Sequence, residues 1–263
     1  MVWRDGVHLT GTPIWCDARR RRDVCFVSAA DRVGRAGHGQ LIATGETLAL
    51  LGASGGGHLG VPLHQRFTLG TLRLELIASG KSPGGAALYV DLAGRTALYA
   101  GDVRAATADV RTADAVVVTA HHEGAPIAGV IAGARERAEA QLRRGVRPVL
   151  LVERVLDGIE VARLLGLPVA AGRRIRDAAA RLDLSIAAPT KEPRATICLA
   201  TERKLPGAVD EAFAWPHGDG GAALRGWIEA TGARDVYVTG PAAETVPGAR
   251  VLGPPHQMSL RFA

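Results

Sequence analysis

Residues 114–171 read DAVVVTAHHEGAPIAGVIAGARERAEAQLRRGVRPVLLVERVLDGIEVARLLGLPVAA, and this stretch decides the fold class. Its apolar runs predict strands at 114–120, 147–153 and 168–171. The segments 129–145 and 155–166 have a helical pattern, and each ends at a glycine. Strands and helices that alternate in this way indicate parallel βαβ units. The sequence therefore predicts an α/β protein.

The segments on both sides of this stretch extend the prediction. Towards the N-terminus, from Asp23 to about Gly101, the pattern is mostly β, with short strands, a short helix at 45–52 and a hairpin at 86–102. A further pair of strands is expected at 67–80, with its turn at Leu69–Gly70. Towards the C-terminus the chain continues with a helix, a polar connector, a strand, a helix and a strand, at 172–182, 186–195, 196–201, 221–232 and 235–240.

The composition predicts a stable globular chain. Of the 263 residues, 47% are hydrophobic and 22% are charged, and no run of about 18 apolar residues marks a membrane span. The start, MVWRDGVHL, has no basic segment followed by an apolar core, so we expect a cytoplasmic protein with no membrane partner. The three cysteines are widely spaced and fit reduced thiols in the core.

The stretch CFVSAADRVGRAGHG, from Cys25 to Gly39, has the form of a buried strand that runs into a loop suited to a metal site. A metal site requires several histidine, cysteine or carboxylate ligands close together. This loop contains no such set. The contrast raises the question of what the loop does instead.

Four further segments carry a resemblance to a known family. They are SGKSPGGAALYV, LYAGDVR, VRPVLLVERVLDGIEVARLLG and WIEATGARDVYVTG. In these segments and in the order of its elements, the chain resembles the metallo-β-lactamase-fold nucleases with a β-CASP-type insertion. It is most similar to the bacterial DNA-ligase-associated exonucleases and their messenger-RNA 3′-end-processing relatives. The resemblance covers nearly the whole chain, from about residue 5.

The resemblance implies an αββα sandwich with a short β-CASP-like α/β insertion. It places the first part of the sandwich at 1–110, the insertion at 111–190 and the return to the sandwich at 191–263. In that family two zinc ions activate the hydroxide that attacks a phosphodiester. Each zinc takes about four nitrogen or oxygen ligands.

The family's ligand positions are largely replaced in this chain. Its H-x-H-x-D-H motif, laid without a gap on SAADRVGRAGHG, falls on Ser28, Ala30, Arg32 and Val33. The histidine of its Ser-Gly-His turn falls on Lys81, and its last histidine falls on Gly240. Only Asp102, in AGDVR, is kept. These seven positions therefore form a vestigial site, and we expect no metal, no cofactor and no catalytic residue.

An unpaired Asp102 carboxylate in such a pocket would be costly, because burial penalises an isolated charge. We therefore expect Arg32 and Lys81 to point into the old site and neutralise Asp102. The alternative is that the pocket has collapsed or opened to water, and that Asp102 remains because Gly-Asp suits the turn.

Other histidines offer weaker candidates. His121, His122 and Glu123 follow a predicted strand, but neighbours on an extended chain point in opposite directions, so a solvated loop tip is the favoured interpretation. His217 and Asp219, in WPHGDGG, match the family's Ser-Asp-His-Ala-Asp signature only after a shift in register. With His38 they form the one candidate set for a relocated metal site.

Basic residues offer a candidate nucleic-acid surface. The net charge is +6, and four consecutive arginines, Arg19, Arg20, Arg21 and Arg22, stand between two aspartates. The fork of an arginine suits phosphate, although such a run is also typical of a solvated turn. The candidate contacts are these four residues together with His38 and Arg104, and the basic helix around Arg143 and Arg144.

Three functions follow from these observations. The first is a pseudoenzyme that serves as a scaffold or partner subunit in DNA repair or RNA processing, with an active paralogue, a processing enzyme or a second copy as its partner. The second is nucleic-acid binding without hydrolysis. The third is a metal-dependent phosphodiesterase with a relocated site.

Overall fold

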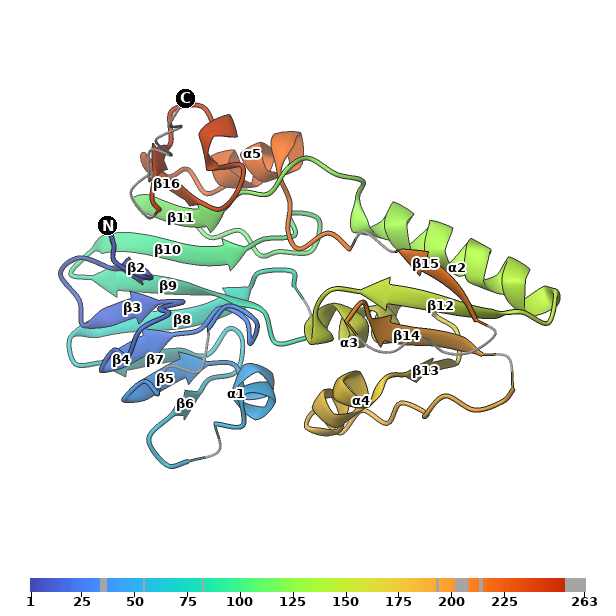
Figure 1. The fold of residues 1–263 in the computed structure, drawn as a ribbon. Coiled ribbons are helices and arrows are strands. Elements are labelled where there is room, and N and C mark those ends of the chain that lie inside the picture. The colour runs from blue at the N-terminus through green and yellow to red at the C-terminus, as the bar shows by residue number, and fades with distance from the viewer. Residues whose placement is uncertain are drawn as a thin grey trace, which may run out of the picture.

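The computed structural model describes residues 1–33, 37–53, 55–81, 83–192, 194–201, 208–212 and 215–253. The chain forms a larger lobe, which contains both ends of the described chain, and a smaller lobe built from its middle (Figure 1). Within these ranges the larger lobe holds two sheets and the smaller lobe holds one. The α/β class predicted from the sequence is therefore confirmed.

The first sheet of the larger lobe has six short strands, paired in chain order. They are β1 (Val2–Trp3), β2 (Val7–His8), β3 (Ile14–Cys16), β4 (Val24–Phe26), β5 (Gln40–Ala43) and β6 (Leu59–Gly60). Helix α1 (Gly45–Leu51) follows β5 directly, and the Thr44 side chain caps its N-terminus by accepting a hydrogen bond from Thr47 N. Gly52 ends the helix in the left-handed conformation.

The second sheet has seven strands in the order β17-β16-β11-β10-β9-β8-β7. Their bounds are β7 (Arg66–Leu69), β8 (Leu72–Ala78), β9 (Ala86–Leu92), β10 (Arg95–Asp102), β11 (Ala115–Thr119), β16 (Asp235–Thr239) and β17 (Arg250–Val251). Strands β7 to β10 are antiparallel, as expected for hairpins, whereas β10, β11, β16 and β17 are parallel. Helix α5 (Gly221–Ala230) leads into β16, and a short 3-10 helix (Ala243–Thr245) follows it.

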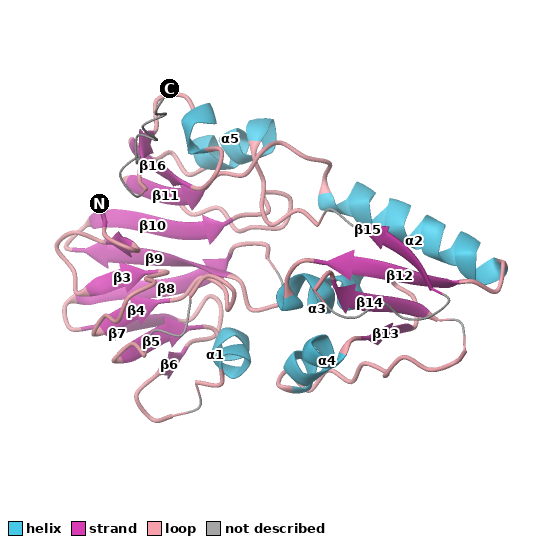
Figure 2. Cartoon of the chain, in the orientation of Figure 1, coloured by secondary structure: helices cyan, strands magenta, loops and turns pink. Residues whose placement is uncertain are grey.

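The two sheets pack face to face, and a helix lies on each outer side (Figure 2). Between the sheets, Ile14 and Phe26 of the first sheet share one cluster with Leu74 and Leu88 of the second. On the outer side of the second sheet, α5 contributes Trp227 to the packing. On the outer side of the first sheet, Leu48 of α1 packs in the same way. The layers therefore run helix, sheet, sheet, helix.

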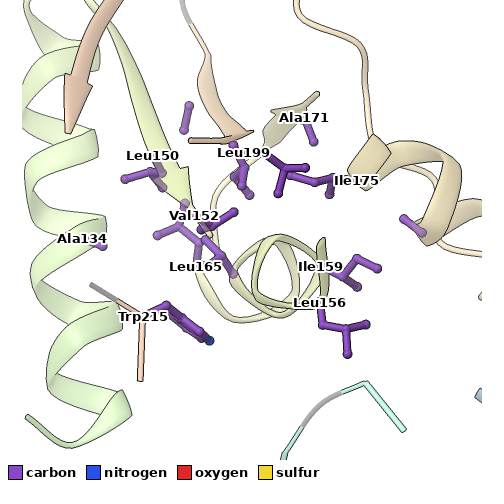
Figure 3. Packing of buried hydrophobic residues seen from close by; sticks show 14 of the residues in the cluster. Ala134, Leu150, Val152, Leu156, Ile159, Leu165, Ala171, Ile175, Leu199 and Trp215 are labelled. Carbon is purple, nitrogen blue, oxygen red and sulfur yellow. The ribbon is translucent and has the colours of Figure 1, made fainter. Parts of the chain in front are cut away.

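The described part of the smaller lobe is a parallel sheet of four strands with three helices. In sheet order the strands are β13 (Val169–Ala171), β14 (Ala195–Leu199), β12 (Arg147–Val152) and β15 (Ala208–Ala212). The helices are α2 (Ile127–Arg143), α3 (Val155–Leu164) and α4 (Arg173–Ala180). Leu150, Ile159 and Ile175 lie in its core, and Trp215 closes one end (Figure 3).

The strand pairing places the middle sheet at 147–212 rather than within the expected range 111–190. Strand β11 lies inside that range but belongs to the seven-stranded sheet, whereas β14 and β15 lie beyond it and belong to the smaller lobe. In the part of the chain that the structure describes, no helix is long and apolar enough to cross a membrane.

Candidate functional site

The site is organised around Asp102, the last residue of β10. The register between β10 and β11 shifts between Tyr99 and Gly101, so the strand bulges just before the aspartate. Gly101 has a φ of +59°, and a Cβ atom there would lie 2.5 Å from the hydroxyl oxygen of Ser28. A glycine is therefore required at this bulge, which directs the Asp102 carboxylate into the site.

Both oxygens of Asp102 accept hydrogen bonds from cationic or polar side chains. Lys81 Nζ donates to Oδ2 at 3.2 Å, and Arg32 Nη1 donates to Oδ1 at 3.3 Å. His121 Nε2 also donates to Oδ1, at 2.9 Å. The ion pairs that the sequence predicts between Asp102 and the two cations are therefore present.

Burial and charge act in opposite directions on these groups. Burial alone would raise the pKa of Asp102, but the hydrogen bond from His121 and the charges of Arg32 and Lys81 hold that pKa well below its usual range. Burial would lower the pKa of Lys81, yet Asp102 and Asp31 raise it. The lysine and both aspartates are consequently ionised at neutral pH.

Arg32 joins this site to a second buried carboxylate. Its Nε donates to Asp17 Oδ2 at 3.4 Å, and its Nη2 donates to Thr119 Oγ1 at 3.1 Å. Asp17 also accepts hydrogen bonds from Ser28 N at 2.8 Å, Ser28 Oγ at 2.6 Å and Tyr99 Oη at 2.9 Å. Arg32 is thereby fixed between two carboxylates by groups that are themselves buried.

Lys81 joins the site to the smaller lobe. Its Nζ lies 3.0 Å from Asp31 Oδ2, and the same oxygen accepts a hydrogen bond from Arg154 Nη1 at 2.9 Å. Burial would raise the pKa of Asp31, but the two cations lower it. Three carboxylates, Asp17, Asp31 and Asp102, thus face three cations, Arg32, Lys81 and Arg154, and we call these six residues the charge cluster.

His121 belongs beside the charge cluster, and its interpretation as part of a solvated loop tip is wrong. Its side chain is 15% exposed, because backbone hydrogen bonds from Ala120 N to Thr239 O and from His121 N to Asp219 O hold the segment against the sheet. The neighbouring His122 and Glu123 are exposed, as expected. The alternation of an extended chain therefore separates the two histidines.

A second buried ion pair lies next to the cluster, between the lobes. Arg104 Nη2 donates to Glu160 Oε2 of α3 at 2.6 Å and to Pro216 O at 2.9 Å. Trp215 Nε1 donates to the same glutamate oxygen at 2.8 Å. His217 lies 3.5 Å from both Glu153 and Asp157, and proximity to the Asp157 carboxylate raises its pKa.

The other replaced positions do not face Asp102 in the same way. Ala30 packs against the core of the smaller lobe, and Val33 packs against the cluster that contains Leu48. Gly240 has a φ of +97°, and a Cβ atom there would lie 2.6 Å from Ala120 O. A histidine would not fit at Gly240 without a change in the backbone.

The structure divides the candidate nucleic-acid contacts into two groups. Arg19, Arg20 and Arg21 are exposed, and Arg22 stacks over Trp15 at 3.7 Å from the ring centroid. His38 is buried and accepts a hydrogen bond from Arg22 N at 3.2 Å. Arg104 is buried with Glu160, so neither His38 nor Arg104 presents its side chain to a nucleic acid in this structure.

The residues do not fit a metal site. Within the described ranges, no three histidine, cysteine or acidic side chains are grouped so that they could hold an ion. The candidate ligands for a relocated metal, His38, His217 and Asp219, are not brought together. His38 accepts a hydrogen bond from Arg22 N, whereas Asp219 Oδ2 accepts one from Ala105 N at 2.7 Å. Zinc ions bound beside Asp102, as in the resembling family, would lie next to the positive charges of Arg32 and Lys81.

Comparisons with known proteins add information on the fold. No family model matches the chain, and no curated protein matches it in sequence. Among solved structures, it is similar to the crystal structure of a protein of unknown function from Enterococcus faecalis V583. The two are 10% identical, with a TM-score of 0.58 over 88% of this chain and 79% of that chain. At this identity the likeness concerns the fold alone.

Proposed function

We propose that this chain is a catalytically inactive, nuclease-like protein of the metallo-β-lactamase fold that acts as a scaffold or partner subunit in the cytoplasm. One observation carries the proposal. Lys81 binds one oxygen of Asp102, while Arg32 and His121 bind the other. Side-chain charge thus occupies the place that the resemblance gives to metal charge.

The layer order supports the fold part of the proposal. An αββα sandwich has the same sequence of helix, sheet, sheet and helix as the larger lobe. The parallel sheet of the smaller lobe lies in the chain between β11 and α5, and so between two parts of the larger lobe, as an insertion would. In this proposal the insertion is the smaller lobe, from α2 to β15, in place of the range 111–190 that the resemblance implies.

The electrostatics support the loss of activity. A divalent cation near Asp102 would lie within a few ångströms of Lys81 and Arg32, and like charges at such distances repel strongly in a buried site. Removing either cation would in turn leave the buried carboxylates around it with less neutralising charge. The hydrolytic chemistry of the family needs metal-bound hydroxide, and among the described residues no three histidine, cysteine or acidic side chains are grouped to hold such a metal.

A nuclease assay tests the inactive state. The purified protein would be incubated with labelled single-stranded DNA, duplex DNA and RNA, with zinc or manganese added. We expect no cleavage above that of the Asp102→Asn variant. Cleavage by the wild type that disappears in Asp102→Asn, while the variant stays folded, would overturn the proposal.

The partner role is tested separately, by co-purification from the native host and by size-exclusion chromatography. We expect a stoichiometric complex with a second protein or a second copy. A chain that remains a lone monomer in its own extract would contradict the role as a partner subunit, although not the loss of hydrolysis.

Nucleic-acid binding without hydrolysis is the second candidate, and the exposed Arg19, Arg20 and Arg21 favour it. Phosphate contacts weaken steeply with salt, so binding through this run should fall as salt rises. Replacing the three arginines with glutamine should remove that binding in a mobility-shift assay. Binding that is unchanged by the replacement would exclude this surface.

A further inference from the structure

A groove lies over the end of the seven-stranded sheet, formed by β7, β8 and β9. One part of it is a cavity of about 310 Å³, lined in part by Arg66, Glu75, Tyr89 and Arg111. A neighbouring hollow of about 500 Å³ shares Arg73 with the first and also Asp91. The two hollows therefore form one continuous surface, which we call the edge groove.

The strand register explains how these side chains come together. Arg66, Glu75 and Tyr89 lie side by side across the three strands. The next row on the same face, two residues along, contains Arg73 and Asp91. Because alternate residues of a strand point to the same face, both rows line the groove.

The edge groove carries excess positive charge. Arg66 and Arg111 lie 3.3 and 3.4 Å from the same oxygen of Glu75, whose carboxylate is almost fully buried. Arg73 is exposed and forms no ion pair with any residue in the described part of the chain. Three arginines thus face two carboxylates, which favours an acidic ligand.

Strand β7 also offers a free edge. It is the last strand of its sheet, and in the described ranges no strand pairs with its outer side. Its residues alternate between the exposed Arg66 and Thr68 and the half-buried Phe67 and Leu69. A strand added at this edge would therefore meet charge on one face and apolar surface on the other.

We propose that the outer edge of β7, together with the adjoining rim of the edge groove, binds an extended segment of a protein partner in which acidic and apolar residues alternate. The segment extends the sheet beside β7, its carboxylates facing Arg66 and Arg73 and its apolar side chains packing by Phe67 and Leu69. Two exposed apolar residues, Leu63 and Val110, add apolar surface nearby. The residues next to them in the chain, His64 and Asp109, lie 3.6 Å apart.

This inference rests on the proposed role as a partner subunit and names the chemistry of the partner. A nucleic acid is a poorer fit, because Glu75 and Asp91 interrupt the positive charge within the groove. A lone small anion would use the arginines but would leave the free edge and the apolar residues of β7 without a function.

Fluorescence anisotropy with a short labelled peptide that alternates aspartate and valine tests the proposal on the full-length protein. We expect binding to the wild type and at least about a tenfold weaker affinity for Arg73→Glu. Arg173→Glu is the matched control, because Arg173 is an 85% exposed arginine on α4 of the other lobe. Its affinity for the peptide should equal that of the wild type.

Two further probes make the outcome decisive. A peptide of the same composition with its aspartates and valines in separate blocks should bind much more weakly, because only the alternating one fits a strand. Equal binding of the two peptides, equal loss in both variants, or displacement by inorganic phosphate or single-stranded DNA would overturn the proposal. Failure here leaves the nuclease assay unaffected, so the two proposals can fail independently.

Discussion

Asp102 is a carboxylate with only 1% of its side chain exposed, and its ionised form depends on its neighbours. Lys81 has 2% of its side chain exposed and divides its charge between Asp102 and Asp31. Each of these buried charges depends on its neighbours of opposite sign, since burial penalises an uncompensated ion by several kcal/mol. The cluster is therefore sensitive to the loss of any one member.

Lys81→Met should show this sensitivity. Removal of the ammonium group leaves two carboxylates with fewer cations, so we expect the free energy of unfolding to fall by about 3 to 5 kcal/mol. Urea denaturation measures it. Lys191→Met, at an exposed lysine, is the control and should change stability by less than about 0.5 kcal/mol.

A double-mutant cycle isolates the pair. Because Asp102→Asn removes the charge that Lys81 neutralises, the double variant Lys81→Met with Asp102→Asn should be more stable than the sum of the single losses implies. Strict additivity of the two single effects would mean that the two side chains do not interact.

The depressed pKa values of Asp31 and Asp102 predict a dependence on pH. A carboxylate whose pKa is lower in the folded state contributes stability that is present above its unfolded pKa, at about 4, and is lost as pH falls towards the folded pKa. Stability should therefore fall as the pH drops below about 5. The free energy of unfolding should fall less steeply with decreasing pH in Asp102→Asn than in the wild type. An identical dependence on pH in the two proteins would argue against this account.

Some members of the site could be predicted from the sequence and others could not. Arg32, Lys81 and Asp102 are found because a resemblance supplies their alignment. Asp17 lies after a three-residue strand at a φ of +47°, and no local pattern indicates that it reaches Ser28 and Tyr99. The local sequence predicts an exposed His121, because its burial depends on Thr239 and Asp219, far along the chain.

The segment 215–219 connects the smaller lobe to α5, and buried bonds hold it in place. Trp215 and Pro216 are both tied to the Arg104–Glu160 pair, which joins the end of β10 to α3. The side chains of this pair are 5% and 2% exposed. The pair therefore fixes the orientation of α3 relative to the larger lobe.

Glu160→Gln should loosen this connection. The buried Arg104 would lose its charged partner, so we expect a loss of about 3 to 5 kcal/mol in unfolding free energy. Hydrogen exchange in 215–221 should also become faster. Glu229→Gln, at an exposed position on α5, serves as the control, and equal effects in the two variants would contradict the role of the pair.

The longer elements could be predicted, and the two-residue strands could not. Helices α2, α3 and α5 and strands β8 to β12 carry clear apolar periodicity, and each agrees with its predicted position to within a few residues. Strands β1, β2, β6 and β17 have two residues each, which is too short for an alternating pattern. Their pairing depends on neighbours brought together by the fold.

The two lobes are coupled by both charge and packing. Arg154 contacts Asp31, and Arg163 contacts Glu46, so α3 and the residue before it are bound to the larger lobe. Leu50 of α1 belongs to the same apolar cluster as Leu156 of the smaller lobe. The smaller lobe is therefore an integral part of the structure.

This coupling predicts one cooperative unfolding transition. Urea denaturation followed by circular dichroism and by tryptophan fluorescence should give coincident curves, because loss of either lobe exposes buried charges in the other. Two separated transitions would show that the lobes fold independently.

The metal content of the purified protein tests the account most directly. After exposure to zinc and manganese and dialysis against metal-free buffer, elemental analysis by mass spectrometry should find well under one ion per chain, since Arg32 and Lys81 already neutralise Asp102. About one tightly bound ion per chain, lost in a folded His121→Ala or Asp102→Asn variant, would contradict it.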